Sequence, residues 1–89
     1  MQRKKIKVIN RLGIHARAAA KLVGTASRYQ SEITIHFKNR AIDAKNIIDV
    51  MVLAARQGSD IELVACGEDE TEAITALEAL IHERFGEEE

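Results

Sequence analysis

Hydrophobic positions along this chain change their spacing several times, and each change predicts a separate structural element. Apolar and charged side chains alternate over residues 5–8, 32–37 and 60–66, which is the period of two typical of a half-buried strand. Asn39 marks a turn into a short strand over residues 40–43, which would pair with the preceding strand as a hairpin. The alternation therefore predicts four strands.

Three other segments repeat their apolar residues every three to four positions, as amphipathic helices do. The stripe of the first segment, residues 16–28, consists of Ala19, Leu22, Val23 and Ala26. The second segment, residues 47–55, follows Asn46 as a helix cap and is too continuously apolar for a helix with one buried face. The third follows Asp69, which together with Glu72 resembles a capping box, and its apolar stripe reaches Phe85.

The predicted order of elements, β-α-β-β-α-β-α, belongs to the α+β class. A chain of 89 residues with 46% hydrophobic content has room for one core. Short strands combined with three amphipathic helices imply a four-stranded, largely antiparallel sheet with the helices on one face and solvent on the other. We therefore expect a single domain over residues 1–89.

Charge is nearly balanced, because 13 basic and 14 acidic residues give a net charge of −1. We therefore expect neither nucleic-acid binding nor membrane insertion. A nucleic-acid-binding module with this element order would need exposed aromatic residues, but Phe37 is the only aromatic residue in a predicted strand. The basic run at residues 3–5 and the acidic run at residues 87–89 are expected to be solvated, frayed ends. Because Cys66 is the single cysteine and no segment resembles a signal peptide, the expected compartment is the reducing cytoplasm.

His15 stands where the first strand gives way to the alanine-rich helix, and this junction is the candidate site for chemistry. The first amides of a helix have no partner within the helix and favour negative charge, so a phosphate on His15 would be stabilised there. A neutral imidazole also offers a ring nitrogen with a lone pair that can attack phosphorus. Arg17 adds a planar fork of donors that suits phosphate oxygens. The alternatives are a capping or surface histidine and an exposed helix arginine.

Two motifs along the chain resemble those of a known family. Residues 12–19 read L-G-I-H-A-R-A-A, close to L-G-[LIM]-H-A-R-P-A, the active-site stretch of HPr, the histidine-containing phosphocarrier of the bacterial phosphotransferase system. Residues 43–51 resemble the N-A-K-S-I-M-x-[VL]-M segment of the same family, and Leu53 and Gly58 follow at the right distance. The resemblance extends over residues 5–85 and implies an open-faced β-sandwich.

The resemblance implies a carrier that forms a phosphohistidine intermediate rather than a free-standing enzyme. The δ nitrogen of His15 would accept the phosphoryl group of phosphorylated enzyme I, derived from phosphoenolpyruvate, and pass it to a histidine of enzyme IIA. Arg17 would stabilise the charge on the equatorial oxygens during transfer. No cofactor is implied, and a monomer is expected. Sugar transport and a nitrogen-related branch both stay open, as does a regulatory homologue that docks to partners without transferring phosphate.

The resemblance also makes Ile47, Ile48 and Met51 a docking patch, whereas a fully buried core stripe is the alternative. Together with residues of the first helix, the patch would form a surface around His15 with an apolar centre and a basic rim. These helix residues are Ala20, Lys21, Gly24 and Ser27. The expected partners present acidic and apolar patches.

Two positions depart from the family pattern. Ala18 replaces a proline that suits the first turn of a helix, so we expect retained function with a less rigid loop. Asn46 stands where many relatives carry a regulatory serine, and its amide can cap a helix but offers no hydroxyl to a kinase. Regulation through a serine at this position is therefore expected to be absent. His36, His82 and Cys66 have no metal-ligand spacing, so no metal site is expected.

Overall fold

A computed structural model describes all residues of the chain, 1–89, and contains one sheet and three α-helices. The strands are β1 (Gln2–Lys7), β2 (Glu32–Phe37), β3 (Arg40–Asp43) and β4 (Asp60–Cys66). The helices are α1 (Ala16–Ala26), α2 (Ile47–Leu53) and α3 (Glu70–His82), followed by a short 3-10 turn, η1 (Arg84–Gly86). The order of elements confirms the sequence prediction.

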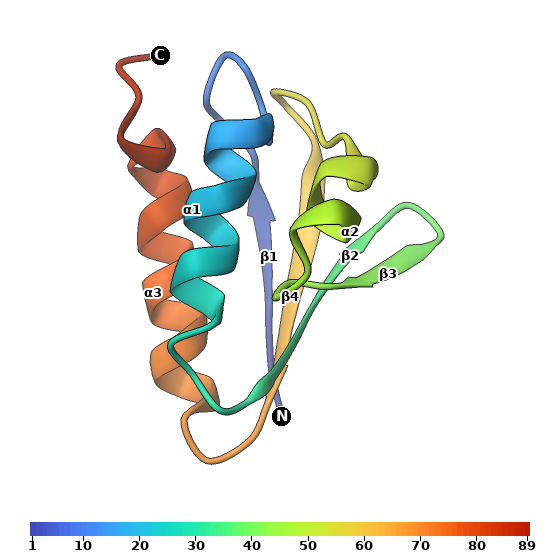
Figure 1. Cartoon of the computed structure of the whole chain (residues 1–89), viewed down its shortest axis with the longest axis vertical. Helices are drawn as coiled ribbons and strands as arrows, with labels where there is room; N and C mark the ends of the chain where they lie inside the picture. Colours follow the sequence, from blue (N-terminus) through green and yellow to red (C-terminus); the bar gives the residue numbers. More distant parts are fainter.

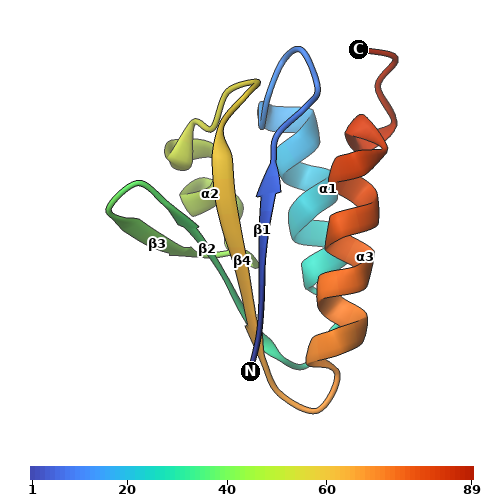
Figure 2. The same cartoon turned by 180° about the vertical axis from the view of Figure 1, so that it is seen from behind.

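The sheet has the order β1-β4-β2-β3, and every neighbouring pair is antiparallel. All three helices lie on one side of it, with α1 between α2 and α3 (Figure 1). The view from behind shows the strands with no helix covering them (Figure 2). This arrangement confirms the open-faced β-sandwich, and it places the start of α1 beside the loop that follows β1.

The core lies between the sheet and the helices because the alternating residues of β2 and β4 meet the apolar stripes there. Ile33, Ile35 and Leu63 are at most 1% exposed, and Leu22 of α1 is fully buried against them. Truncating one such side chain to alanine costs about 2–5 kcal/mol. Phe85 is also fully buried although it lies beyond α3, in η1, with a left-handed φ of 55°. The core therefore anchors the chain only a few residues before its acidic end.

The capping box predicted at the start of α3 is wrong. The Asp69 side chain makes no bond to the helix amides. Instead, its carboxylate accepts hydrogen bonds from the amides of Gln30 (2.9 Å) and Ser31 (3.0 Å) and from the Ser31 hydroxyl (2.5 Å). These hydrogen bonds lower the pKa of Asp69, and the bond from the Ser31 hydroxyl makes the largest contribution. A partner 38 residues away competes for the cap side chain, and no local pattern reports it.

The two charged ends are largely exposed to solvent, as expected, but contrary to the expectation they are not frayed. Residues 3–5 lie within β1, where β4 supplies hydrogen-bonding partners, and the terminal amine of Met1 lies 2.8 Å from the Glu70 carboxylate. At the other end, Glu89 forms an ion pair with Arg11 at 2.8 Å. None of the helices combines the length and the apolarity needed to cross a membrane.

Candidate functional site

His15 is the N-cap of α1, with an extended backbone conformation (φ −89°, ψ −175°). Its carbonyl accepts the amide of Ala19 at 2.7 Å, whereas its side chain makes no capping bond. The amides of Ala16, Arg17 and Ala18 precede the first intrahelical bond and have no hydrogen-bond partner in the structure. The ring of His15 therefore stands at the positively polarised end of a helix.

A tight turn before the helix fixes the position of His15. Gly13 adopts φ +66°, and its carbonyl accepts a hydrogen bond from the buried Asn10 side chain at 2.7 Å. The next amide, that of Ile14, donates to the carbonyl of Ala55 at 2.9 Å. A Cβ on Gly13 would lie 2.6 Å from this same carbonyl oxygen, so the close approach of the two backbones requires glycine. The histidine is thus held by the loop between α2 and β4.

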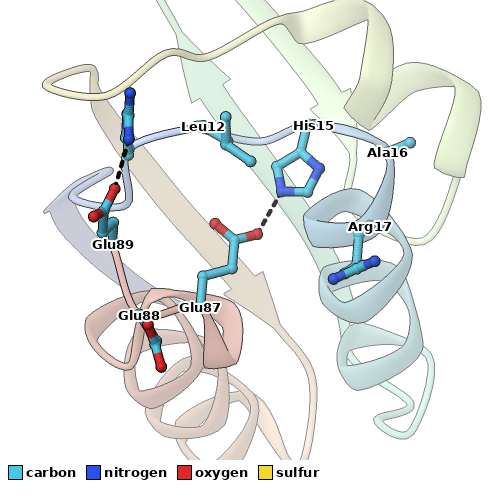
Figure 3. Close-up of a pocket in the computed structure, with 8 residues that line it drawn as sticks. Leu12, His15, Ala16, Arg17, Glu87, Glu88 and Glu89 are labelled. Atoms are coloured by element: carbon cyan, nitrogen blue, oxygen red, sulfur yellow. Dashed lines mark hydrogen bonds and ion pairs between the residues drawn. The ribbon is translucent and has the colours of Figure 1, made fainter.

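The two ring nitrogens of His15 have different surroundings. Nε2 is hydrogen-bonded to the carboxylate of Glu87, whereas Nδ1 has no partner. In Figure 3 the free nitrogen lies on the side of the ring away from Glu87, toward Ala16 and Arg17. The His15 side chain is 30% exposed and that of Glu87 is 15% exposed. The ring is therefore held in place on a partly exposed side chain, and Nδ1 is left without a hydrogen-bond partner.

Glu87 is the acidic residue at the centre of the site. Besides His15, it contacts Asn10, whose side-chain amide donates to the Glu87 carboxylate at 2.9 Å. The hydrogen bonds from Asn10 and His15 lower the pKa of Glu87, with the larger contribution from Asn10, so the carboxylate is charged at neutral pH. Sequence reasoning missed both residues as parts of the site, and only the acidic run itself offered a signal.

A hollow beside the ring is lined by His15, by the first residues of α1, by the loop before it and by the acidic tail. The lining residues are Arg11, Leu12, His15, Ala16, Arg17, Glu87, Glu88 and Glu89. Arg17 is exposed and forms no ion pair, so its guanidinium is free to bind an anion next to the ring. The structure thus brings His15 and Arg17 together at one end of α1, as the sequence predicted.

The comparisons with known proteins agree with this geometry. The family described as the PTS HPr component phosphorylation site matches residues 2–83. The phosphocarrier protein HPr of Xylella fastidiosa is 51% identical over 80 residues, which are 90% of each chain. The chain belongs to the HPr family. HPr of Neisseria meningitidis is 44% identical over 87 residues, 98% of each chain.

Solved HPr structures share the whole fold. A crystal structure of HPr from Thermoanaerobacter tengcongensis matches with a TM-score of 0.97 at 44% identity and covers 100% of both chains. An HPr dimer from the same organism matches with a TM-score of 0.79, also at 44% identity, and covers 98% of this chain and all of the other. The family assigns the chain to the phosphocarriers of the phosphotransferase system.

The second HPr motif forms α2 and leaves part of it exposed. Asn46 caps the helix, since its side chain accepts the amide of Asp49 at 3.1 Å. Ile47, Ile48 and Met51 are 38%, 64% and 43% exposed, so they are not core residues. The core side of α2 is formed by Val50 and Leu53 instead. Val52, on the same helix, is also 54% exposed.

The outer side of α1 carries the remaining predicted contact residues of this HPr homologue. Ala20, Gly24 and Ser27 are exposed and spaced so that they share one face with Arg17. Lys21 is exposed too, but its ammonium donates to the carbonyl of Phe85 at 2.5 Å. Lys21 therefore holds the segment before the acidic tail as well as adding positive charge near the site.

The family's usual proline is absent at a position where the structure leaves the amide unpaired. Ala18 is fully buried in the first turn of α1, and its N–H makes no hydrogen bond. An alanine there keeps the helix without needing a partner for that amide.

Elsewhere, His36 is half-buried beside Thr34 on β2, while His82 and Cys66 are exposed. No three histidine, cysteine or acidic side chains form a group that could hold a metal ion.

Proposed function

We propose that this protein carries a phosphoryl group on His15, which it accepts from phosphorylated enzyme I and passes to a histidine of enzyme IIA in the cytoplasm. The observation that carries the proposal is the arrangement at the start of α1. There, an accessible imidazole has an unpartnered Nδ1, and three helix amides beside it have no acceptor. Family membership supports the same reading, since the matched family is described by its phosphorylation site.

The transfer step needs no cofactor. The lone pair of Nδ1 forms a bond to phosphorus as the bond between phosphorus and the donor's histidine nitrogen breaks, and the donor nitrogen keeps that electron pair. The His15 ring then carries the phosphoryl group and a positive charge, and the donor imidazole becomes neutral. In the second transfer His15 is the donor, and a histidine nitrogen of enzyme IIA forms the new bond to phosphorus as the bond to Nδ1 breaks. Alignment of the two rings across a docked interface supplies most of the acceleration.

The helix end tunes this equilibrium rather than drives it. A helix N-terminus stabilises a negative charge by about 0.3–1 kcal/mol at an exposed site and about 2 kcal/mol in better geometry. A half-exposed ring such as that of His15 falls between these limits. Arg17 adds charge-assisted hydrogen bonds to the equatorial oxygens, which are the atoms that carry the developing charge.

The docking surface in this proposal combines α1 and α2, which pack against each other. Its apolar part is Ile47, Ile48 and Met51, and Val52 extends it on the same helix. Its α1 part consists of Ala20, Lys21, Gly24 and Ser27. An exposed apolar patch beside cationic side chains suits partners that present apolar and acidic groups. The monomer is the functional form in this proposal, since the docking surface lies within one chain.

The test is phosphorylation of the purified protein by enzyme I and phosphoenolpyruvate labelled with ³²P. We expect one acid-labile, base-stable label, which is lost in His15→Ala while the far-ultraviolet circular dichroism spectrum stays unchanged. No label on the wild-type protein would refute the carrier function and favour a homologue that only docks. The enzyme IIA that accepts the label then decides between the sugar and nitrogen-related branches.

Arg17 and the docking patch are tested separately. Arg17→Ala should slow single-turnover transfer within the complex by about 10–100-fold, because one or two charge-assisted bonds to the phosphoryl oxygens are lost, with little change in affinity. Ile48→Glu should instead weaken affinity for enzyme I and leave the single-turnover rate unchanged. Thr75→Glu on α3 is the matched control, since it adds the same charge at another exposed position. Equal effects of Ile48→Glu and Thr75→Glu would refute the patch.

A further inference from the structure

The acidic tail returns to the site in a defined way. Phe85 is fully buried, and its carbonyl is bound by Lys21 of α1 at 2.5 Å, so the chain two residues before Glu87 is fixed by the core. From this anchor Glu87 reaches Nε2 of His15, which lies 72 positions earlier in the sequence. The contact is therefore a tertiary feature of the fold and not a chance approach of a free tail.

We infer that Glu87, oriented by Asn10, is a positioning residue that keeps the proton of the His15 ring on Nε2 and so leaves Nδ1 as the phosphoryl acceptor. The inference rests on the proposed function for its consequence in transfer. Its structural half, the state of the ring in the unphosphorylated protein, can be tested without any transfer. No pattern in the sequence links the three residues.

Asn10 fixes the position of the Glu87 carboxylate. Its side chain is fully buried, and its Nδ2 uses both hydrogens, one on the carbonyl of Gly13 (2.7 Å) and one on Glu87 (2.9 Å). The reverse orientation of the amide would place its oxygen against these two acceptor oxygens, so the bonds define the orientation. The Oδ1 atom has no hydrogen-bond partner, so both side-chain contacts of Asn10 are made by its Nδ2. The turn that carries His15 and the tail that carries Glu87 are thus tied to one side chain.

The carboxylate of Glu87 accepts hydrogen bonds only, so the nitrogen that faces it must carry the hydrogen. A neutral imidazole has a single N–H, and the other nitrogen then has its lone pair free. When Nδ1 forms its bond to phosphorus, the ring becomes a cation that keeps the proton on Nε2, and no proton has to move during the step. Glu87 then faces a positively charged ring and stabilises it. A carboxylate or a backbone carbonyl commonly orients a functional histidine through its other ring nitrogen in this way.

Other charges around the site do not replace this contact. Arg11 is paired with Glu89, and Lys21 is bound to a backbone carbonyl. Glu88 lines the same hollow but makes no hydrogen bond or ion pair with His15. Glu88→Ala therefore removes the same charge from the same tail without touching the ring, which makes it the matched control for Glu87→Ala.

The first measurement is ¹⁵N NMR of the His15 ring in the unphosphorylated protein at neutral pH. In the wild-type protein and in Glu88→Ala we expect Nε2 to appear protonated, Nδ1 to appear as a bare nitrogen, and the Nε2 proton to exchange slowly with water. In Glu87→Ala the ring nitrogen shifts should move toward those of a freely exchanging imidazole, and the slow proton should disappear. Ring shifts of Glu87→Ala identical to those of Glu88→Ala would overturn the inference.

The second measurement uses each variant as the substrate of enzyme I. Glu87→Ala should lower kcat about tenfold, the effect of one charge-assisted hydrogen bond, and leave KM within about twofold of the wild-type value. Glu88→Ala, which removes a charge from the same hollow but keeps the partner of Nε2, should lower kcat much less than Glu87→Ala does. A normal kcat in Glu87→Ala would also overturn the inference. If the wild-type protein is not phosphorylated at all, the proposed function fails, and the NMR result still decides whether Glu87 sets the state of the ring.

Discussion

Replacing Gly13 by alanine should destabilise the protein more than any other glycine-to-alanine change near the site. Gly13 has φ +66°, a region in which alanine costs about 1–2 kcal/mol. The added Cβ would also lie 2.6 Å from the oxygen of Ala55 and 2.8 Å from the Cα of Arg56. Both are backbone atoms, so the loop must move and the bond between the Ile14 amide and the Ala55 carbonyl, now 2.9 Å long, is lost. A broken bond between buried groups adds about 1–3 kcal/mol, which gives a loss of about 2–5 kcal/mol.

Two other glycines separate the contributions. Gly58 has φ +89° but no atom within 4 Å of a Cβ, so Gly58→Ala should lose only the conformational part, about 1–2 kcal/mol. Gly24 lies within α1 with nothing within 4 Å, so Gly24→Ala should stabilise the protein by about 0.5–1 kcal/mol. Urea unfolding followed by circular dichroism measures all three as shifts of the midpoint at constant m. A Gly13→Ala variant no less stable than Gly58→Ala would refute the argument that two backbones meet at this turn.

Three further predictions concern helix starts. Asp69→Asn should lower the thermal midpoint, whereas Glu72→Gln should leave it unchanged. Because the pKa of Asp69 is lowered in the folded state, its contribution to stability is present above about pH 4 and is lost as the pH falls further. Equal effects of the two substitutions would instead support a capping box of Asp69 and Glu72. Ala18→Pro should change stability by less than about 1 kcal/mol in urea unfolding, since the amide it removes has no partner, and a larger loss would show that the first turn needs that amide. Asn46→Ala should lower the free energy of unfolding by about 1 kcal/mol because the hydrogen bond to the Asp49 amide is lost. Asn46→Ser should lose less stability, since a serine hydroxyl can also cap the helix, and equal losses in the two variants would argue against a capping role.

Local patterns predicted most of the fold because periodicity is a local signal. The alternation at residues 32–37 and 60–66 and the stripe of α1 each follow from which side chains one face must bury, whatever the distant partner is. The same logic placed His15 at a helix start, since a glycine turn and an alanine-rich stripe surround it. It also predicted that α2 has more apolar side chains than one face can bury, and Ile48 and Met51 are the exposed excess.

The errors all involve partners that are distant in sequence. Asp69 is a good cap by type, but the turn at Ser31 offers its carboxylate three donors instead. Composition alone predicts a frayed end at the basic run, whereas its pairing with β4 makes it a strand. Glu87 belongs to the site only because Phe85 is buried and returns the chain to His15. None of these contacts leaves a periodic signal, so a pattern-based prediction cannot find them.

The charge balance of the site fits the proposed carrier function, in which a phosphoryl group must leave as easily as it arrives. The hollow beside His15 is lined by two arginines, Arg11 and Arg17, and by the three glutamates of the tail, and Arg11 is already paired with Glu89. A strongly cationic site would bind a phosphoryl group too tightly for onward transfer, whereas an acidic one would repel it. Under the proposed function, one free guanidinium and three unpaired amides would act on the phosphoryl side of the ring, and the carboxylate of Glu87 would act on the opposite nitrogen. Attraction for the phosphoryl oxygens and for the charged ring is thus divided between separate groups, so each can be altered by mutation without removing the other.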